Sequence, residues 1–189
     1  MDAVPIRAAR RGDVPSLLLL FQAMTAENAR IDARFAVHPD AAEHMSRAFL
    51  AWVDDPSRVV LVAEEGQRLL VGYAAGVLHA GDGLGAHEQI GEVTDCFVVP
   101  ARRRKGVARR LAGRLFDVLV ERGADAVRLQ VVAQNQASQD FWTSLGYAPL
   151  EEVLERPVPA TSAAAPVANP PPPPPPPPPY QMRLIGVGS

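Results

Sequence analysis

A short stretch rich in arginine and glycine, residues 102–108, has the composition of a phosphate-binding turn. It follows a strand-like run that ends at Val99 and precedes an amphipathic run, so it should lie at a helix N-terminus. Unpaired backbone N–H groups and the positive end of the helix dipole favour a bound phosphate there. Gly106 and Ala108 let the backbone approach such a ligand closely. The stretch therefore predicts a ligand that carries a diphosphate.

The order of residues in this stretch argues against nucleotide hydrolysis, because no G-x-x-x-x-G-K-[ST] motif is present and the basic residues precede the glycine. The stretch instead resembles the coenzyme A motif of the GNAT N-acetyltransferases, V-x-P-x-x-[RQ]-x-x-G-x-[GA]. Val98 or Val99 would close the strand. The remaining matched positions are Arg103, Gly106 and Ala108.

A second stretch, residues 135–147, is similar to another motif of the same family, N-x-x-[AS]-x-x-[FL]-[YW]-x-x-x-G-[FY]. The two motifs stand in the family's order, with one helix and one strand expected between them. On these motifs the chain is identified as a GNAT superfamily member over residues 4–155. The resemblance implies an α+β fold with a central mixed, mostly antiparallel sheet flanked by helices. It also implies an acetyl-coenzyme A-dependent N-acetyltransferase.

The resemblance implies which residues bind acetyl-coenzyme A. Backbone groups of residues 97–99 should bind the pantetheine arm, residues 104–109 should surround the diphosphate, and Asn135 should hold the cofactor from the opposite strand and helix. The complete set of expected cofactor-binding residues is Phe97, Val98, Val99, Arg103, Arg104, Lys105, Gly106, Val107, Ala108, Arg109, Asn135, Ser138 and Trp142.

Two carboxylates are candidates for the base that the reaction needs. An alkyl ammonium has a pKa of about 10.4 and must lose a proton before its nitrogen can attack a thioester. Glu92 begins the strand from which related enzymes often draw a water-mediated base, and Asp95 is the competing carboxylate. Their spacing would place them on opposite faces of a regular strand. Glu92 is the favoured candidate.

Stabilisation of the oxyanion and protonation of the leaving thiolate are the other chemical requirements. Backbone N–H groups near Phe97 and Val98 could stabilise the oxyanion. The family often uses a tyrosine as the acid, but Trp142 stands at that position, and an indole donates a hydrogen bond without being a useful acid. Tyr147 and Tyr73 are alternatives, and the coenzyme A thiolate could also leave through water.

Cysteine and histidine usage argues against covalent and metal chemistry. Cys96 is the single cysteine and has no histidine near it in sequence, which predicts direct attack rather than an acyl-enzyme. The four histidines lack metal-ligand spacing, so no metal is expected. Of these, His79 or His87 is expected near the acceptor.

The elements that must position these residues alternate between strand-like and helix-like periodicity, as in a sheet domain with helices. Asp13 should cap the first helix, and Gly123 should end the helix after the basic stretch. The expected order is strand 4–8, a helix from residue 13, helix 40–53, antiparallel strands 59–63 and 69–78, strand 92–99, a helix ending at 123, and strand 127–132.

The glycine-rich stretch Gly81–Ala86 fits a permissive dinucleotide pattern, G-x-G-x-x-A. Its context does not fit, because a dinucleotide turn opens a helix, whereas this stretch leads soon into another strand. We therefore expect a flexible loop near the acceptor.

Proline content divides the chain into an N-acetyltransferase domain (1–156), a proline-rich insertion (157–179) and a returning strand with a tail (180–189). A strand around residues 151–156 should pair with residues 180–185. The insertion could be a solvated spacer or the ligand of a proline-binding partner. Exchange of the returning strand with a second subunit would give a homodimer.

Composition limits the partners. Nineteen basic and 21 acidic residues give a net charge of −2, which argues against nucleic acid and anionic membrane surfaces. The apolar run at residues 17–21 is too short to cross a bilayer, no export signal is visible, and one cysteine suits a cytoplasmic protein. The acceptor is expected to be a primary amine on a small molecule, an amino acid or a peptide. The alternatives are a catalytically weak coenzyme A-binding sensor or interaction module, and a scaffold that presents the polyproline tract to a partner.

Overall fold

The computed structural model describes residues 4–66, 68–83 and 85–156, and the predicted insertion and returning strand lie outside these residues. Residues 1–146 form one compact unit. The described strands are β1 (Ile6–Ala8), β2 (Arg58–Glu65), β3 (Leu69–Ala80), β4 (Gln89–Val98) and β5 (Ala126–Leu129). The helices are α1 (Val14–Ile31), α2 (Ala41–Asp54), α3 (Val107–Glu121) and α4 (Gln136–Thr143), with 3-10 turns η1 (Arg11–Asp13), η2 (Ala33–Phe35) and η3 (Pro100–Arg102).

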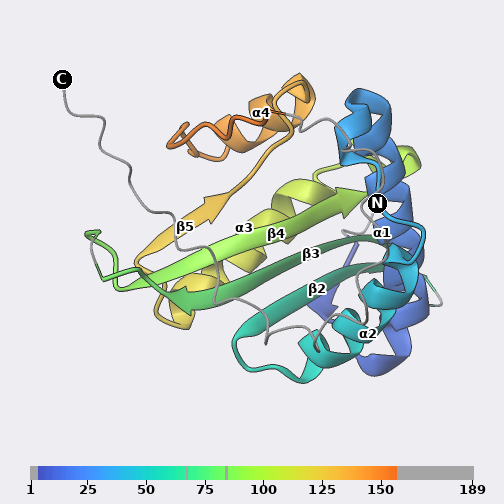
Figure 1. Ribbon diagram of the computed structural model, residues 1–189. Coiled ribbons are helices and arrows are strands. Elements are labelled where there is room, and N and C mark those ends of the chain that lie inside the picture. The colour runs from blue at the N-terminus through green and yellow to red at the C-terminus, as the bar shows by residue number, and fades with distance from the viewer. Residues whose placement is uncertain (1–3, 67, 84, 157–189) are drawn as a thin grey trace, which may run out of the picture. The chain divides into compact units, whose positions relative to one another are not determined.

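The five strands form one sheet in the order β1-β2-β3-β4-β5 (Figure 1). The first three pairings are antiparallel, and β4 pairs with β5 in parallel. The predicted mixed, mostly antiparallel sheet flanked by helices is therefore confirmed, as is the hairpin of β2 and β3.

Helices cover both faces of this sheet. On one face, α1 and α2 pack on Val60, Val62, Tyr73 and other core residues, and Phe49 of α2 is completely buried there. On the other face lies α3, which Figure 1 shows behind the sheet. A Cβ at Gly76 of β3 would come within 3.3 Å of Leu115 and 2.8 Å of a β4 carbonyl, so glycine lets α3 approach closely.

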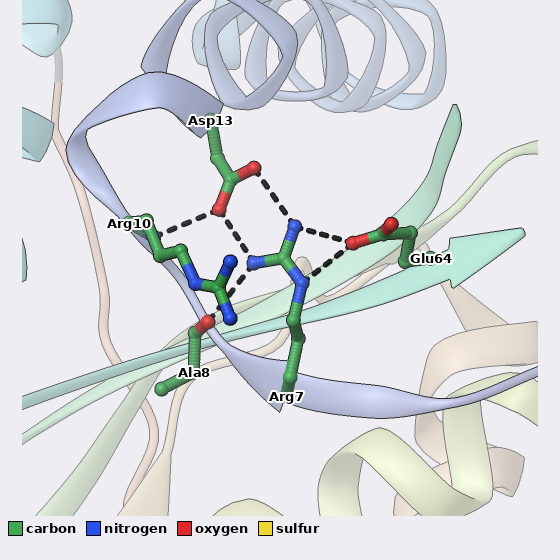
Figure 2. Close-up of polar contacts among 5 residues, drawn as sticks. All are labelled: Arg7, Ala8, Arg10, Asp13 and Glu64. Carbon is green, nitrogen blue, oxygen red and sulfur yellow. Dashed lines mark hydrogen bonds and ion pairs between the residues drawn. The ribbon is translucent and has the colours of Figure 1, made fainter. Parts of the chain in front are cut away.

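The predicted role of Asp13 as the cap of α1 is wrong, because its side chain makes no capping hydrogen bond to that helix. Its carboxylate accepts from Arg7 Nη1 at 2.7 Å and from the Arg10 backbone N–H at 2.8 Å. Figure 2 shows the Arg7 guanidinium between Asp13 and Glu64, whose Oε2 lies 2.5 Å from Arg7 Nε. We call Arg7, Arg10, Asp13 and Glu64 the Arg7 cluster. It joins β1, β2 and the start of α1.

A second correction concerns the strand predicted at residues 151–156, where the structure has neither helix nor strand. Three apolar side chains there, Leu150, Val153 and Leu154, are 67%, 69% and 85% exposed. A strand is stabilised by hydrogen bonds to a neighbour, and the proposed neighbour at 180–185 lies outside the described residues.

Candidate functional site

The sheet opens along one edge of β4. β5 pairs with β4 from Ile90 opposite Ala126 to Val93 opposite Leu129, and β5 then ends. β4 continues to Val98, so no described residue of β5 pairs with residues 94–98. Their backbone groups on that side can bind an extended ligand as a missing strand would.

Within the predicted set 97–99, Val98 is the residue whose backbone faces this open edge. The Val99 N–H donates to Val71 O of β3 at 3.0 Å, so the Val98 carbonyl, across the same trans peptide, points away from β3. The Phe97 carbonyl oxygen lies only 2.7 Å from the Cβ position of Gly72 on β3, so the Val98 N–H also points away from β3. The Phe97 carbonyl and the Val99 N–H, by contrast, point toward β3.

The residues after β4, 103–108, form what we call the basic turn, and it has the expected anion-binding geometry. Gly106 adopts a left-handed φ of 74° directly before α3 and has no side chain to cap the helix. The Arg110 N–H donates to Gly106 O at 3.1 Å. The N–H groups of Val107, Ala108 and Arg109 precede that bond and have no acceptor in the helix. They can bind an anion at the positive end of the helix dipole.

The four cations among the predicted cofactor-binding residues divide into two pairs. Arg104 and Lys105 are exposed and make no ion pair or hydrogen bond with a described residue. Arg109 donates to Ser144 Oγ at 2.9 Å, which joins α3 to the end of α4. Arg103 donates to Val98 O at 2.9 Å and forms an ion pair with Glu27. Two of the predicted cations are therefore available to a ligand, and two are already engaged.

The second motif forms α4 and its cap. Asn135 Oδ1 accepts the Ser138 backbone N–H at 3.1 Å, so Asn135 begins the helix and leaves its amide NH2 group for another acceptor. Trp142 is 8% exposed and packs edge to face on Phe141, with ring centroids 5.0 Å apart. Trp142 is thus a buried residue of α4.

The two carboxylates lie on the same face of the sheet, which corrects the sequence-based expectation of opposite faces. Asp95 pairs with Ala75, but the next residue of β3, Gly76, pairs with Val93, so Thr94 is an extra residue on β4. This irregularity reverses the alternation of side chains along β4. Glu92 opposite Val77 therefore lies on the same face as Asp95, the face that α1 and α2 cover.

Asp95 is a buried carboxylate, and the structure gives it two internal partners. Tyr73 Oη donates to its Oδ1 at 3.0 Å and Thr94 Oγ1 donates to its Oδ2 at 2.9 Å. Burial raises the pKa of Asp95, although both hydrogen bonds favour its charged form. Burial and the neighbouring Asp95 charge also raise the pKa of Tyr73 well above its ordinary value. Tyr73 is therefore a poor candidate for the acid.

Glu92 is more accessible. Its side chain is 37% exposed, and its Oε2 lies 3.7 Å from Nε2 of His79 on β3. The Arg128 position of β5 pairs with Glu92 in the sheet register and lies on the same face. His79 Nδ1 lies 3.1 Å from Ala80 O, and Nε2 is the ring nitrogen that lies nearer to Glu92. A carboxylate in this place can exchange a proton with water or a substrate.

Cys96 and the glycine-rich loop are the remaining predicted features. Cys96 pairs with Ala74 on the α3 face, and burial raises the pKa of its thiol to about 12. A nucleophilic thiolate is thus disfavoured. After the stretch Gly81–Ala86, the Glu88 N–H donates to Asp125 Oδ2 at 2.7 Å, just before the start of β5. The role of this stretch in acceptor binding stays a prediction.

The described residues include neither a membrane-spanning helix nor a metal-binding cluster. No helix there is long and apolar enough to cross a bilayer. The same residues hold no group of three or more His, Cys, Asp and Glu side chains placed to bind a metal ion.

Sequence reasoning missed Glu27, whose carboxylate contacts Arg103 across 76 positions of sequence. It also missed Thr94 as the extra strand residue. The only sequence signal for Glu27 is its place one helical turn after Met24, which packs against the core of the same face. No local pattern connects it with the basic turn.

Comparison with known proteins agrees with this geometry. The profile of the acetyltransferase (GNAT) family matches residues 24–147. Mycothiol acetyltransferase of Renibacterium salmoninarum is 32% identical over 122 residues, which are 61% of this chain and 35% of that protein. The chain thus matches about a third of the length of this relative.

Solved structures share the fold. A tetramutant of the BH1408 protein from Bacillus halodurans superposes with a TM-score of 0.72 and 22% identity, covering 82% of this chain and 99% of that one. The aminoglycoside N-acetyltransferase AAC(6')-Iy in complex with CoA gives a TM-score of 0.63 and 17% identity, covering 82% and 95%. Because the family profile spans well over half of the residues and includes the open edge, the basic turn and α4, this chain belongs to the acetyltransferase (GNAT) family of N-acetyltransferases.

Proposed function

We propose that the protein transfers the acetyl group of acetyl-coenzyme A directly to a primary amine, with Glu92 as the base. The observation that carries this proposal is the continuity of the open edge of β4 with the unoccupied donors of the basic turn. An arm bound along residues 94–98 leads to a helix N-terminus that suits its diphosphate.

The residues present fit such a cofactor. The Val98 N–H would bind the pantetheine arm or the thioester oxygen, and the N–H groups of residues 107–109 would bind the diphosphate. Arg104 and Lys105 add positive charge in the same turn. Asn135 and Ser138 would face the cofactor from α4. The capping hydrogen bond uses only Oδ1 of Asn135, so its NH2 group can donate to the cofactor.

The chemistry follows from these positions. The ammonium of the acceptor loses a proton to Glu92, directly or through a water, and its nitrogen then attacks the thioester carbon. The C–N bond forms and the C–S bond breaks. The nitrogen then loses a second proton, which passes through water to the leaving thiolate, so the products are the N-acetylated amine and the coenzyme A thiol. The Val98 N–H stabilises the oxyanion, an effect of about 3 kcal/mol for one well-placed donor. We favour Glu92 over Asp95 because the Asp95 carboxylate is buried and already hydrogen-bonded to Tyr73 and Thr94.

The acceptor class rests on weaker similarity. The relative at 32% identity is named for mycothiol, and the chain matches only about a third of it. We therefore propose an amine on a small molecule, with amino acids and peptide N-termini as the other classes.

Titration calorimetry with acetyl-coenzyme A and a thiol-release assay over a panel of amines test the proposal. We expect saturable binding and turnover with at least one amine. Binding without turnover on any amine would instead identify a coenzyme A-binding module, and absence of binding would refute the central claim.

Substitution of the base gives a sharper test. Glu92→Gln should lower kcat about a hundredfold and flatten its rise with pH, while affinity for coenzyme A stays within about twofold. Glu121→Gln, which removes an exposed carboxylate at the end of α3, is the matched control and should leave kcat unchanged. A loss of kcat in Asp95→Asn with none in Glu92→Gln would transfer the role to Asp95.

A further inference from the structure

Arg103 makes three contacts at the end of β4, and none of them is with another residue of the basic turn. Its Nε donates to Val98 O at 2.9 Å. Its guanidinium lies 5.5 Å from the centre of the Phe97 ring. Its Nη1 and Nη2 donate to Glu27 Oε1 and Oε2 at 2.8 and 2.6 Å, which is a two-pronged ion pair with α1. The arginine is therefore held from two sides.

The contact with Val98 controls what the open edge of β4 presents. Both the N–H and the carbonyl of Val98 face that edge. Arg103 occupies the carbonyl and leaves the N–H directed outward. An acceptor group of a ligand would therefore meet one donor rather than a donor beside an unpaired acceptor.

Glu27 determines the orientation of Arg103. Both of its carboxylate oxygens are engaged by the guanidinium, and this hydrogen bonding holds the pKa of Glu27 below its usual value. α1 also contacts β3 through Met24, whose sulfur lies 3.8 Å from the Tyr73 hydroxyl, and that hydroxyl donates to Asp95 of β4. α1 thus lies close to the end of β4 at Arg103 and is connected with Asp95 through Tyr73.

We propose that Glu27 and Arg103 are positioning residues: the pair fixes α1 against the end of β4 and reserves the Val98 N–H for the pantetheine arm or acyl group. Arg103 then acts through Val98 and is not a ligand of the diphosphate. This inference rests on the coenzyme A binding proposed above.

If Glu27 had a different role, its substitution would change the affinity for coenzyme A in the opposite direction. If Glu27 merely restrained an arginine that swings onto the diphosphate, removal of the Glu27 charge would release Arg103 and tighten coenzyme A binding. If Arg103 positions Val98, the same change weakens it. Coenzyme A carries both the diphosphate and the pantetheine arm, whereas ADP carries the diphosphate without the arm. The two probes therefore separate the two roles.

Calorimetric titration of the full chain with coenzyme A and with ADP is the test. Glu27→Gln should raise the Kd for coenzyme A about two- to fivefold, as expected for a half-exposed ion pair. Arg103→Ala, which also removes the Val98 contact, should raise it about tenfold. The Kd for ADP should change less than about 1.5-fold in both variants, since neither residue is assigned to the diphosphate.

The matched control is Glu121→Gln, which removes the exposed pair of Arg114 and Glu121 on α3 and should change neither Kd. Glu27→Gln should melt within about 2 °C of this control, which separates positioning from general destabilisation. Tighter or unchanged coenzyme A binding in Glu27→Gln overturns the inference, as does an equal loss of ADP and coenzyme A binding in Arg103→Ala. A wild-type chain that binds no coenzyme A would refute the proposed function itself.

Discussion

Two regions of the molecule share one local architecture and use it differently. β1, η1 and α1 form a strand, a 3-10 turn and a helix with arginines between them, and β4, η3 and α3 repeat that order. In the first region Asp13 precedes the helix, and its carboxylate pairs with Arg7. In the second, Gly106 precedes the helix and contributes no side chain.

The difference lies in the residue at the helix start, and it gives the two regions different local charges. The Arg7 cluster carries its own anions, and the side chains of Arg7, Asp13 and Glu64 are only 14% to 24% exposed. The basic turn has two cations, Arg104 and Lys105, that pair with no described residue, and Gly106 supplies no carboxylate at the helix N-terminus. A strand-turn-helix unit that lacks an acidic side chain at this position is left with capacity for an anionic ligand.

The largest effect should come from giving the second region the acidic residue of the first. Gly106→Asp adds a negative charge beside the diphosphate and places a side chain at a left-handed φ, so the Kd for coenzyme A should rise about a hundredfold. Gly106→Asn is the matched control, since asparagine tolerates the left-handed conformation and carries no charge. Titration calorimetry on both variants measures the difference; equal affinities would show that charge at this position is irrelevant.

The next effect tests the first region. Arg7→Ala leaves two partly buried carboxylates without their cation, so the free energy of unfolding should fall by about 2 kcal/mol. Arg11→Ala removes an exposed pair with Asp54 and should cost less than about 0.5 kcal/mol. Denaturant unfolding measures both. A Kd for coenzyme A that shifts in Arg7→Ala would contradict the separation of the two regions.

The Arg7 cluster should also make stability depend on pH. The hydrogen bond from Arg7 lowers the pKa of Asp13 below its ordinary value. The resulting stabilisation is complete above the unfolded aspartate pKa of about 4 and is lost as pH falls through the lower folded pKa. The free energies of unfolding of wild type and Arg7→Ala should therefore become more similar as pH falls from neutral to pH 3. A constant difference down to the acid end would show that Asp13 is not linked to Arg7.

The smallest effects belong to the exposed cations of the basic turn. Lys105→Gln should raise the Kd for coenzyme A about threefold at low salt, and less at high salt, without changing stability. Arg104→Asn should behave similarly in binding and could gain stability, because Arg104 has a φ of 59° that asparagine adopts more readily. Salt-dependent titrations check this; a loss of stability in either variant would make these side chains structural.

Local sequence signals predicted much of the fold. Gly123 has the left-handed φ expected where the helix ends, and the amphipathic run expected after the basic stretch forms α3, with Leu111, Leu115 and Leu119 fully buried. These predictions succeed because a helix and its ends depend on neighbours within a few residues. The two family motifs are likewise made of residues that lie close together in the sequence.

What only the tertiary structure decided depends on pairing between distant segments. Glu92 and Asp95 share a face because β3 and β4 pair with one extra residue at Thr94, and nothing in the β4 sequence fixes that register. Arg103 turns toward α1 because Glu27 is there, and Asp13 binds Arg7 rather than capping α1 because β1 brings the guanidinium beside it. Side-chain direction and ion-pair choice are set by which backbones lie side by side, and that arrangement is determined by packing of the whole sheet rather than by any single stretch of sequence.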